Sequence, residues 1–304
     1  MSMASDVMHC YFCGSQKVKL SLSQRTILFG GEEYRFIFCQ GCRGFSLFPT
    51  LTDSQLFDLY SSDYVDQDQG EPSASEDTSA VKFSDLKEYL RKQIGMQGKV
   101  FLDYGCGANP VSFQLARENG FLPRGMELSA DVRELAALNT GVKLLSREDI
   151  RGGSELFDVI FLGDVLEHLV DPVYELKFLR TKLAEGGTLL AQGPLQGAMT
   201  LTHLMVRLFA WATRGKVTSY PPYHVSLASS ISMKRLLETS GFQLTHIKTF
   251  EVDWPAPSLA EVRRHFTPRN LTLFVTKKID KLLAAILPRY GTRYFLSCSP
   301  NTAL

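Results

Sequence analysis

The sequence lacks a charge bias, a leader segment and any long hydrophobic run. Its 304 residues carry 33 Lys and Arg against 32 Asp and Glu, a net charge of +1, so no global basic field is available to hold a nucleic-acid backbone. The first ten residues have neither the basic start nor the apolar run of a secretory signal. The apolar stretch Leu201–Ala212 contains His203 and Arg207 and is too short to span a bilayer. These absences predict a soluble, cytoplasmic protein for which nucleic acid is a disfavoured partner.

Three composition regimes follow one another along the chain, and none contains an internal repeat. Residues 1–50 are rich in Cys and aromatic side chains, and residues 51–80 form a connector. Within the connector, the stretch 61–80 holds six acidic residues and no basic one, which favours a solvated linker over an acidic docking site. Residues 81–304 carry enough apolar sequence for a large core.

Apolar strands alternate with amphipathic helices from residue 81 onward. Ser129 is placed to cap one of these helices, and Gly186-Gly187 is placed to end another. Alternation at this length predicts an α/β fold with a doubly wound sheet and right-handed crossovers. The expected strands are 99–104, 122–128, 156–162 and 188–192, and the expected helices are 110–119, 130–138 and 172–183.

A glycine-rich turn follows the first of these strands, where a doubly wound sheet binds its ligand. Gly105 and Gly107 let the backbone turn sharply and approach a ligand closely. A dinucleotide-binding fingerprint needs a further glycine at position 110, which is Pro110. No phosphate-binding Gly-Lys-Ser/Thr loop is present either. The turn therefore favours a ligand other than a dinucleotide or a nucleoside triphosphate.

The run from Asp103 through Gly105 and Gly107 resembles motif I of class I S-adenosylmethionine (SAM)-dependent methyltransferases. That motif is an acidic residue followed by G-x-G-x-G, and Asn109 stands here at the third glycine. Asn tolerates left-handed backbone better than other non-glycine residues, so the turn is retained. The resemblance implies a Rossmann-like, seven-stranded methyltransferase sheet with SAM as cofactor.

Acidic residues recur after later strands at positions that match this family. Glu127 ends the second strand, 24 positions after Asp103, where a carboxylate accepts from the ribose hydroxyls. By resemblance, Asp149 accepts from the adenine amino group and Ile150 flanks the base, while Asp164 and Val165 lie beside the methionyl part. The predicted cofactor-binding residues are Asp103, Gly105, Cys106, Gly107, Glu127, Leu128, Asp149, Ile150, Asp164 and Val165.

Four of the six cysteines form two Cys-x-x-Cys pairs, Cys10/Cys13 and Cys39/Cys42. In a reducing compartment this spacing favours metal ligands over disulfides, because two intervening residues let both thiolates reach one ion. The pairs resemble the two zinc knuckles of a zinc ribbon. Four thiolates make a closed tetrahedral site, which predicts a structural Zn²⁺. Iron fits the same ligands, and redox-active cysteines are the less favoured alternative.

The resemblance extends to bacterial small-molecule and sugar methyltransferases of the methyltransferase-23 type, which join such a ribbon to the catalytic domain. It implies a zinc ribbon over 1–50, a connector over 51–80 and a methyltransferase domain over 81–304. Insertions on the acceptor side are expected at about 194–225 and 253–290. In such enzymes the N-terminal module helps to cover the acceptor pocket.

Two histidines are candidate general bases. His224 stands five residues before Ser229, the offset of a proposed base in sugar C-methyltransferases, although Pro222-Tyr223 replaces their usual His-Glu. His168 belongs to a Leu-Glu-His segment that lies at the pocket edge in many small-molecule methyltransferases. The alternatives are that His224 only orders its loop and that His168 bonds to backbone in a helical turn.

The sequence thus predicts a SAM-dependent methyltransferase that acts on an O, N or C atom of a small molecule, such as a sugar or another biosynthetic metabolite. An RNA methyltransferase is an alternative, disfavoured by the neutral charge and by the missing Asn/Asp-Pro-Pro-aromatic motif. A zinc-dependent interaction protein without catalysis is another. The apolar faces of Leu201–Trp211 and Leu271–Leu287 favour core or lid packing over contact with a membrane surface or a partner. The oligomeric state is not set by the sequence.

Overall fold

The computed structural model describes residues 7–21, 26–59, 82–93, 95, 97–108, 110–195, 200–212, 217–218, 221–252, 256–287 and 290–301. The acidic stretch 61–80 and Asn109 lie outside the described residues. The chain forms two compact units. Unit 1 comprises Met1–Thr52, Pro194–Leu236 and Lys248–Tyr294, and unit 2 comprises Asp53–Gly193, Leu237–Ile247 and Phe295–Leu304. The domain boundaries drawn from the sequence stay a prediction.

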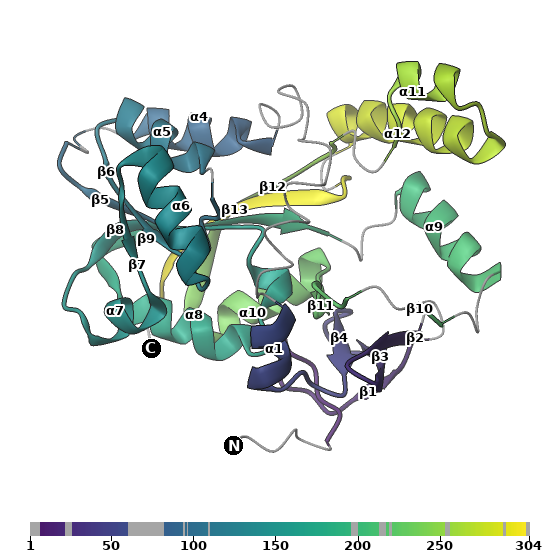
Figure 1. The fold of residues 1–304 in the computed structure, drawn as a ribbon, viewed down its shortest axis with the longest axis horizontal. Coiled ribbons are helices and arrows are strands. Elements are labelled where there is room, and N and C mark those ends of the chain that lie inside the picture. Colours follow the sequence, from purple (N-terminus) through teal and green to yellow (C-terminus); the bar gives the residue numbers. More distant parts are fainter. Residues whose placement is uncertain are drawn as a thin grey trace. The chain divides into compact units, whose positions relative to one another are not determined.

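A seven-stranded sheet organises unit 2, in the order β12-β13-β9-β8-β5-β6-β7 (Figure 1). Strands β5 to β9 are mutually parallel where they pair. The sheet's strands are β5 (Val100–Tyr104), β6 (Leu122–Met126), β7 (Lys143–Leu145), β8 (Phe157–Gly163), β9 (Leu183–Pro194), β12 (Phe242–Phe250) and β13 (Arg293–Pro300).

The strand order reverses between β5 and β8, which are neighbours although β6 and β7 intervene in the sequence. Such a switch point is where a doubly wound sheet opens a crevice at its carboxyl edge. Helices α4 (Ser84–Lys92) and α5 (Val111–Glu118) lie on one face of the sheet and α8 (Pro172–Thr181) lies on the other (Figure 1). The predicted methyltransferase fold is confirmed.

The helices of unit 2 begin where the sequence supplies caps. Ser129 accepts a hydrogen bond from the Val132 amide and starts α6 (Ala130–Thr140), as predicted. Asp171 does the same for α8, and its Oδ1 accepts from the Tyr174 amide. Pro110 is the N-cap of α5 rather than its first helical residue. The remaining described helices here are α1 (Asp53–Leu59), α7 (Arg147–Gly152) and the 3-10 turn η1 (Leu166–His168).

One boundary differs from the sequence prediction. The strand expected at 188–192 begins already at Leu183, so Gly186 lies inside β9. The register with β8 shifts between Phe157 and Val159, and Gly186 takes a positive φ of 72°. This irregularity accommodates the two glycines within the strand instead of ending it.

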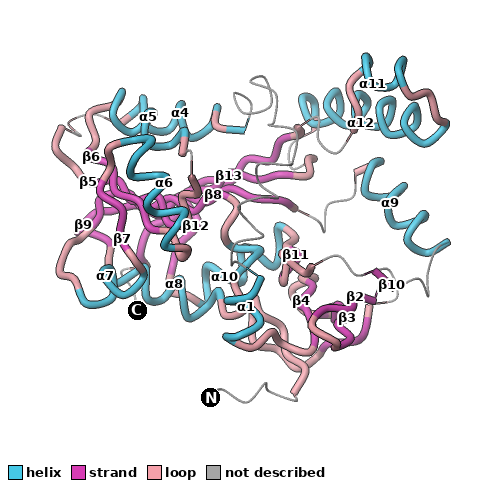
Figure 2. The backbone as a smooth tube through the Cα atoms, in the orientation of Figure 1, coloured by secondary structure: helices cyan, strands magenta, loops and turns pink. Residues whose placement is uncertain are grey.

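Unit 1 contains a second sheet, in the order β10-β2-β3-β4-β11 (Figure 2). Strand β1 also pairs with β3. The pairs β1–β3, β2–β3, β3–β4 and β4–β11 are antiparallel, and β10–β2 is parallel. The strands are β1 (Val18–Leu20), β2 (Thr26–Phe29), β3 (Glu32–Cys39), β4 (Phe45–Phe48), β10 (Val217–Thr218) and β11 (Ser226–Leu227).

In the described part of the chain after β9, four further helices occur: α9 (Leu201–Ala212), α10 (Ser230–Thr239), α11 (Leu259–Arg264) and α12 (Pro268–Ile286). Helix α12 contacts both α9 and α11. Among the helices that the structure describes, none has the length and apolarity required to cross a bilayer.

Candidate functional site

The turn after β5 is closely packed against the loop after β8. Gly105 has a φ of +84°, and a Cβ built on it would lie 2.7 Å from Cγ2 of Val165. Gly107 has a φ of +66° and open space where its Cβ would be. The amides of Gly105 and Cys106 both donate to the Met126 carbonyl, at 2.8 and 3.0 Å. Glycine is therefore needed at 105 for space and backbone, and at 107 for backbone alone.

Glu127 joins this turn to the loop after β6. Its Oε2 accepts from the Gly107 amide at 3.1 Å, and its Oε1 accepts from the Leu128 amide at 2.6 Å. The Ser129 amide also donates to Oε1, at 3.4 Å. A carboxylate has about four acceptor positions, so three bonds leave about one position, on Oε2, for a ligand hydroxyl. Arg133 Nη1 fixes the loop by donating to the carbonyls of Glu127 and Leu128 at 2.7 and 2.8 Å. Leu128 is 56% exposed beside this carboxylate.

Asp103 is buried at the end of β5. The Ser112 hydroxyl donates to its Oδ2, and its residue surface is 4% exposed. Burial raises the pKa of Asp103 to about 7, an effect that the bond from Ser112 opposes, while nearby Glu127 adds to it and Lys82 reduces it. A cation bound in this crevice would favour the ionised form of Asp103.

Asp164 stands at the end of β8 in left-handed backbone, with a φ of 57°. Its Oδ2 pairs with Lys82 Nζ at 2.7 Å, and its amide donates to the Gln192 carbonyl. Lys82 comes from the segment before α4 and was not among the residues predicted from the sequence. No motif marks it, because its partner lies 82 positions further on. The pair places a positive and a negative side chain at the same strand end.

Asp149 and Ile150 lie on α7, at the edge of the sheet. Asp149 Oδ2 accepts from the amide and hydroxyl of Ser146, both at 2.8 Å, in a capping box. These hydrogen bonds lower the pKa of Asp149, so the carboxylate is ionised. The predicted role of Asp149 toward adenine stays a prediction. Ile150 is buried, and its predicted contact with the base stays a prediction as well. A cavity of about 420 Å³ beside α7 includes both residues but none of the glycine turn.

Helix α7 is fastened to the sheet by a buried carboxylate. Glu175 of α8 accepts from the Tyr104 hydroxyl and from two guanidinium nitrogens of Arg147, and it is 2% exposed. Arg147 is the first residue of α7, and Tyr104 precedes Gly105. This network was missed from the sequence, because its three members lie on separate elements with no shared spacing. It fixes both the predicted adenine side and the glycine turn.

The environment of Cys106 disfavours its thiolate form. Burial raises the pKa of its thiol, and the neighbouring carboxylates of Asp103 and Glu127 raise it further. The thiol is therefore protonated and acts as a small apolar group.

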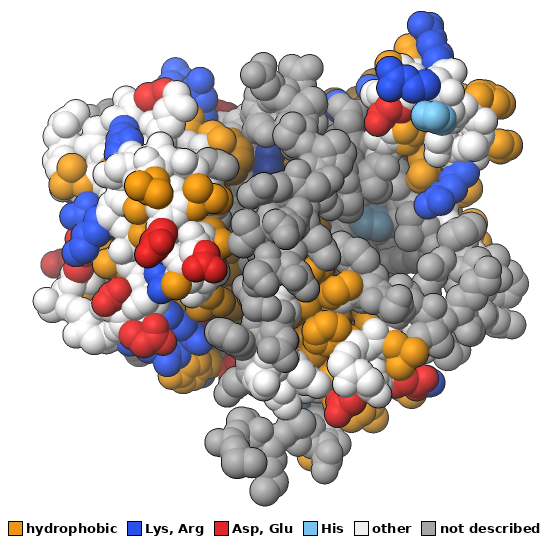
Figure 3. All heavy atoms as spheres, in the orientation of Figure 1, with side chains coloured by type: hydrophobic (Ala, Val, Ile, Leu, Met, Phe, Trp, Pro, Cys, Tyr) orange, Lys and Arg blue, Asp and Glu red, His pale blue; other side chains and the backbone are white. Residues whose placement is uncertain are grey.

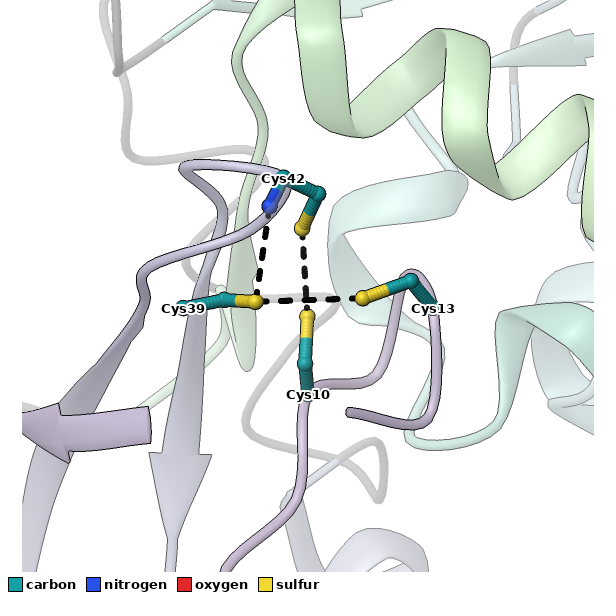
Figure 4. Close-up of side chains that lie close together, drawn as sticks. All are labelled: Cys10, Cys13, Cys39 and Cys42. Carbon is teal, nitrogen blue, oxygen red and sulfur yellow. Dashed lines mark hydrogen bonds between the residues drawn. The ribbon is translucent and has the colours of Figure 1, made fainter. Parts of the chain in front are cut away.

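The four paired cysteines of unit 1 converge on one point (Figure 4). Their sulfur atoms all lie within 4.8 Å of one another, with Cys10 to Cys42 at 3.4 Å and Cys13 to Cys39 at 3.8 Å. Zinc–sulfur bonds of about 2.3 Å in a tetrahedron place the sulfurs about 3.8 Å apart. The observed spacing therefore fits one Zn²⁺ at the centre of the cluster.

Both Cys-x-x-Cys loops have the same backbone design. The residue after the second cysteine is left-handed in each, Gly14 with a φ of 67° and Arg43 with a φ of 63°. Its amide donates to the carbonyl of the first cysteine, at 2.8 Å in one loop and 3.0 Å in the other. The Cys42 amide also approaches the Cys39 sulfur at 3.5 Å. Amide donors of this kind stabilise thiolate ligands.

The pKa values of the cluster's thiols are compatible with a bound cation. The hydrogen bond from Cys42 lowers the pKa of Cys10 to about 5, while burial raises the pKa of Cys13 to about 11. Four thiolates in one buried place repel one another, so the metal-free cluster retains protons. A divalent cation at the centre would replace those protons and would stabilise all four thiolates.

The second knuckle is bonded to a segment nearly two hundred residues away. Strand β11 pairs with β4, and the Leu47 amide donates to the Val225 carbonyl at 2.8 Å. The Ser229 hydroxyl donates to the Cys42 carbonyl at 3.2 Å. Ser229 and Ser232 exchange hydrogen bonds that start α10. The loop that carries His224 thus forms part of the ribbon's own sheet.

The two candidate bases lie in different units. His168 ends η1 of unit 2, where its amide donates to the Val165 carbonyl and its Nε2 lies 4.0 Å from Oε1 of the buried Glu167. His224 lies in unit 1 between Tyr223 and the bonded Val225, and it is half-buried. Their roles stay predictions. The side chain of Trp211 lies outside the described residues.

Comparison with known proteins agrees with this geometry. Residues 78–247 match a family model described as a methyltransferase domain. The ubiquinone biosynthesis O-methyltransferase of Coxiella burnetii (strain Dugway 5J108-111) is 29% identical over 109 residues, 34% of this chain and 46% of that protein. The enzyme of the same name from Cereibacter sphaeroides (strain ATCC 17025 / ATH 2.4.3) is 30% identical over 104 residues, 32% of this chain and 42% of that protein.

A solved structure shows the same fold. It is a chain of the complex between the Haloferax volcanii Trm112 methyltransferase activator and the putative methyltransferase, with 13% identity and a TM-score of 0.55. The match covers 82% of this chain and 97% of that chain. Because the family model spans more than half of the sequence, the chain belongs to the methyltransferase domain family, the class I SAM-dependent methyltransferases. It spans less than half the length of the curated relatives that it matches.

Proposed function

We propose that this chain transfers the methyl group of SAM to a small-molecule acceptor. The observation that carries the proposal is the carboxylate of Glu127, which bridges the amides of Gly107 and Leu128 at the switch point of the sheet. A carboxylate held in this way is oriented before any ligand arrives, and its remaining acceptor position on Oε2 suits a ribose hydroxyl.

The charged groups of unit 2 match the remaining parts of the cofactor. Lys82 suits the cofactor's carboxylate, and Asp164 suits its ammonium group. The buried Asp103 adds a negative charge at the cationic end once ionised. When bound, SAM supplies a methyl group on a sulfonium, and transfer yields the methylated acceptor, S-adenosylhomocysteine and a proton. The chain's contribution is alignment and removal of water.

A base is required wherever the acceptor atom carries a proton, and we infer that His224 or His168 takes it. The bonds from Leu47 to Val225 and from Ser229 to Cys42 hold the His224 loop to the ribbon. A structural Zn²⁺ on Cys10, Cys13, Cys39 and Cys42 would rigidify that support. We therefore assign the ribbon a positioning role toward the acceptor loop.

The acceptor class follows from the relatives and the charge. The curated relatives are named as O-methyltransferases of ubiquinone biosynthesis, so a hydroxyl group is the first acceptor to test. The net charge of +1 disfavours a nucleic-acid acceptor. The expected compartment is the cytoplasm, where thiols stay reduced for metal binding.

Calorimetric titration with SAM tests the cofactor site. Replacing Glu127 with Ala removes a charged acceptor from the ribose, which costs about 2 kcal/mol or more, so the dissociation constant should rise at least about 30-fold. Glu134→Ala, which removes an exposed carboxylate from α6, is the matched control and should bind SAM normally. Equal affinities for the two variants would refute the assignment of Glu127.

The acceptor is found by incubating the protein with labelled SAM and fractionated metabolites, followed by mass spectrometry of the labelled product. The Glu127→Ala variant should leave every fraction unlabelled. With the acceptor in hand, His224→Ala and His168→Ala are compared: the variant that retains SAM affinity and loses turnover identifies the base. Absence of label in all fractions, with SAM bound normally, would favour a non-catalytic zinc protein.

A further inference from the structure

Helix α12 presents its apolar side outward and its polar side inward. Its exposed apolar residues recur at spacings of four, four, three and four, which places them on one side of the helix. A helix of a globular protein ordinarily buries such a side. The stripe consists of Leu271, Val275, Ile279, Leu282 and Ile286, which are 40%, 44%, 41%, 62% and 66% exposed. The core packing favoured from the sequence is wrong for this stripe, and the lid packing that the sequence favoured beside it stays a prediction.

Buried polar groups fix this orientation. Lys277 is 2% exposed, and its Nζ donates to Glu251 Oε2 at 2.6 Å. Asp280 is fully buried and accepts from the amides of Leu201 and Thr202, at 3.0 and 2.9 Å. Turning the stripe inward would leave both charges without these partners, which is strongly unfavourable. The outward side is therefore a stable feature of unit 1.

The hairpin of α11 and α12 is also basic. Residues 256–287 contain six Lys and Arg and two Asp and Glu, a net charge of +4, compared with +1 for the whole chain. Arg263, Arg264 and Lys278 are exposed, and Phe266 is 69% exposed at the turn between the helices. Figure 3 shows hydrophobic and basic side chains side by side at this end, in the upper right of the view.

We propose that the outward side of the α11–α12 hairpin docks on an anionic lipid surface. The stripe from Leu271 to Ile286 is about 22 Å long at 1.5 Å per residue, and it would lie along the surface at the level of the headgroups. The exposed arginines and Lys278 would pair with lipid phosphates. This contact is peripheral, and it is independent of the proposed methyl transfer.

The charges favour anionic lipid over a second copy of the chain or RNA as the partner of this surface. In a second copy docked stripe to stripe, two hairpins with a net charge of +4 each would be brought together, and their charges would repel one another. RNA would pair with the basic groups but would leave five large apolar side chains in water. Anionic lipid satisfies both the apolar stripe and the positive charge.

Cosedimentation of the full chain with vesicles tests the proposal. The protein should bind phosphatidylcholine vesicles that contain phosphatidylglycerol, and added salt or pure phosphatidylcholine should weaken the binding. R263Q/R264Q should weaken it about 25-fold, since each charge contributes about fivefold. L282S/I286S should weaken it at least about tenfold. L138S on α6, where Leu138 is 83% exposed, is the matched control and should bind as wild type.

Several results would overturn the inference. One is the absence of vesicle binding, and another is equal binding by wild type and L282S/I286S. A dimer in sedimentation equilibrium that L282S/I286S dissociates would assign the stripe to a second copy instead. A gel shift with RNA that R263Q/R264Q abolishes, without vesicle binding, would assign the charge to nucleic acid. Circular dichroism and bound zinc establish that each variant is folded. If L282S/I286S is not folded, the vesicle binding of R263Q/R264Q tests the proposal instead.

Discussion

Replacing Gly105 with Ala should damage both the stability of unit 2 and its cofactor site. The positive φ costs a residue with a Cβ about 1–2 kcal/mol. The new Cβ would also lie 2.7 Å from Cγ2 of Val165, and such overpacking costs about 1–3 kcal/mol more. The free energy of unfolding should therefore fall by about 2–5 kcal/mol. Gly107→Ala has the same backbone penalty without the collision, so its free energy of unfolding should fall by only about 1–2 kcal/mol.

A double-mutant cycle separates the two contributions. Val165→Ala removes the methyl group that the new Cβ at position 105 would strike, so the double variant should be about 1–3 kcal/mol more stable than the sum of the single variants predicts. Urea unfolding measures the stabilities, and calorimetric titration with SAM measures the site. Gly105→Ala should bind SAM weakly, and the double variant should recover part of that affinity.

Two outcomes would refute this reasoning. Additive effects of Gly105→Ala and Val165→Ala would show that the two residues do not collide. Equal stability of Gly105→Ala and Gly107→Ala would show that only backbone conformation matters at this turn.

Three further predictions concern protons, zinc and the buried network. The Asp103 pKa of about 7 lies above its value in the unfolded chain. The contribution of this group to stability, at most about 4 kcal/mol, is therefore complete below about pH 4 and is lost as the pH rises through 7. Asp103→Asn should reduce the pH dependence of the free energy of unfolding measured across this range. A zinc chelator should increase amide hydrogen exchange at 226–229 as well as in the ribbon, because Ser229 bonds to Cys42. Residues 130–140 should stay protected and serve as the control. Unchanged exchange at 226–229 would contradict the coupling. Glu175→Gln should lower the free energy of unfolding by about 2–3 kcal/mol, as measured by urea unfolding. This loss is smaller than the loss expected for a fully buried ion pair, because Arg147 is one-third exposed.

The parallel sheet and the glycine turn were predictable because their signals are local. Apolar runs ending at Gly105, the cap at Ser129 and the acid at Glu127 each depend on a few adjacent residues. The contact of Glu127 with Gly107 then follows from adjacent strand ends. The cysteine cluster was predictable for the same reason, because each pair carries its own spacing.

The remaining features depend on long-range packing, which no local pattern encodes. The ion pair of Lys82 with Asp164 joins distant segments. Strand β11 has only two residues, too few for an alternating signal, yet it completes the ribbon's sheet. The helical spacing of the apolar residues in α12 is evident in the sequence. Which side of the helix is buried depends instead on Lys277 and Asp280, whose partners lie in distant segments.

The pairing of β4 with β11 determines when the N-terminal module can finish folding during synthesis. The ribosome makes β4 about 180 residues before its neighbour β11. Until then the edge of β4, which carries the apolar Phe45 and Leu47, has unpaired amides and carbonyls on that side. This module is thus completed only after β11 has been made, and the nascent chain must protect β4 from pairing with other chains in the interval.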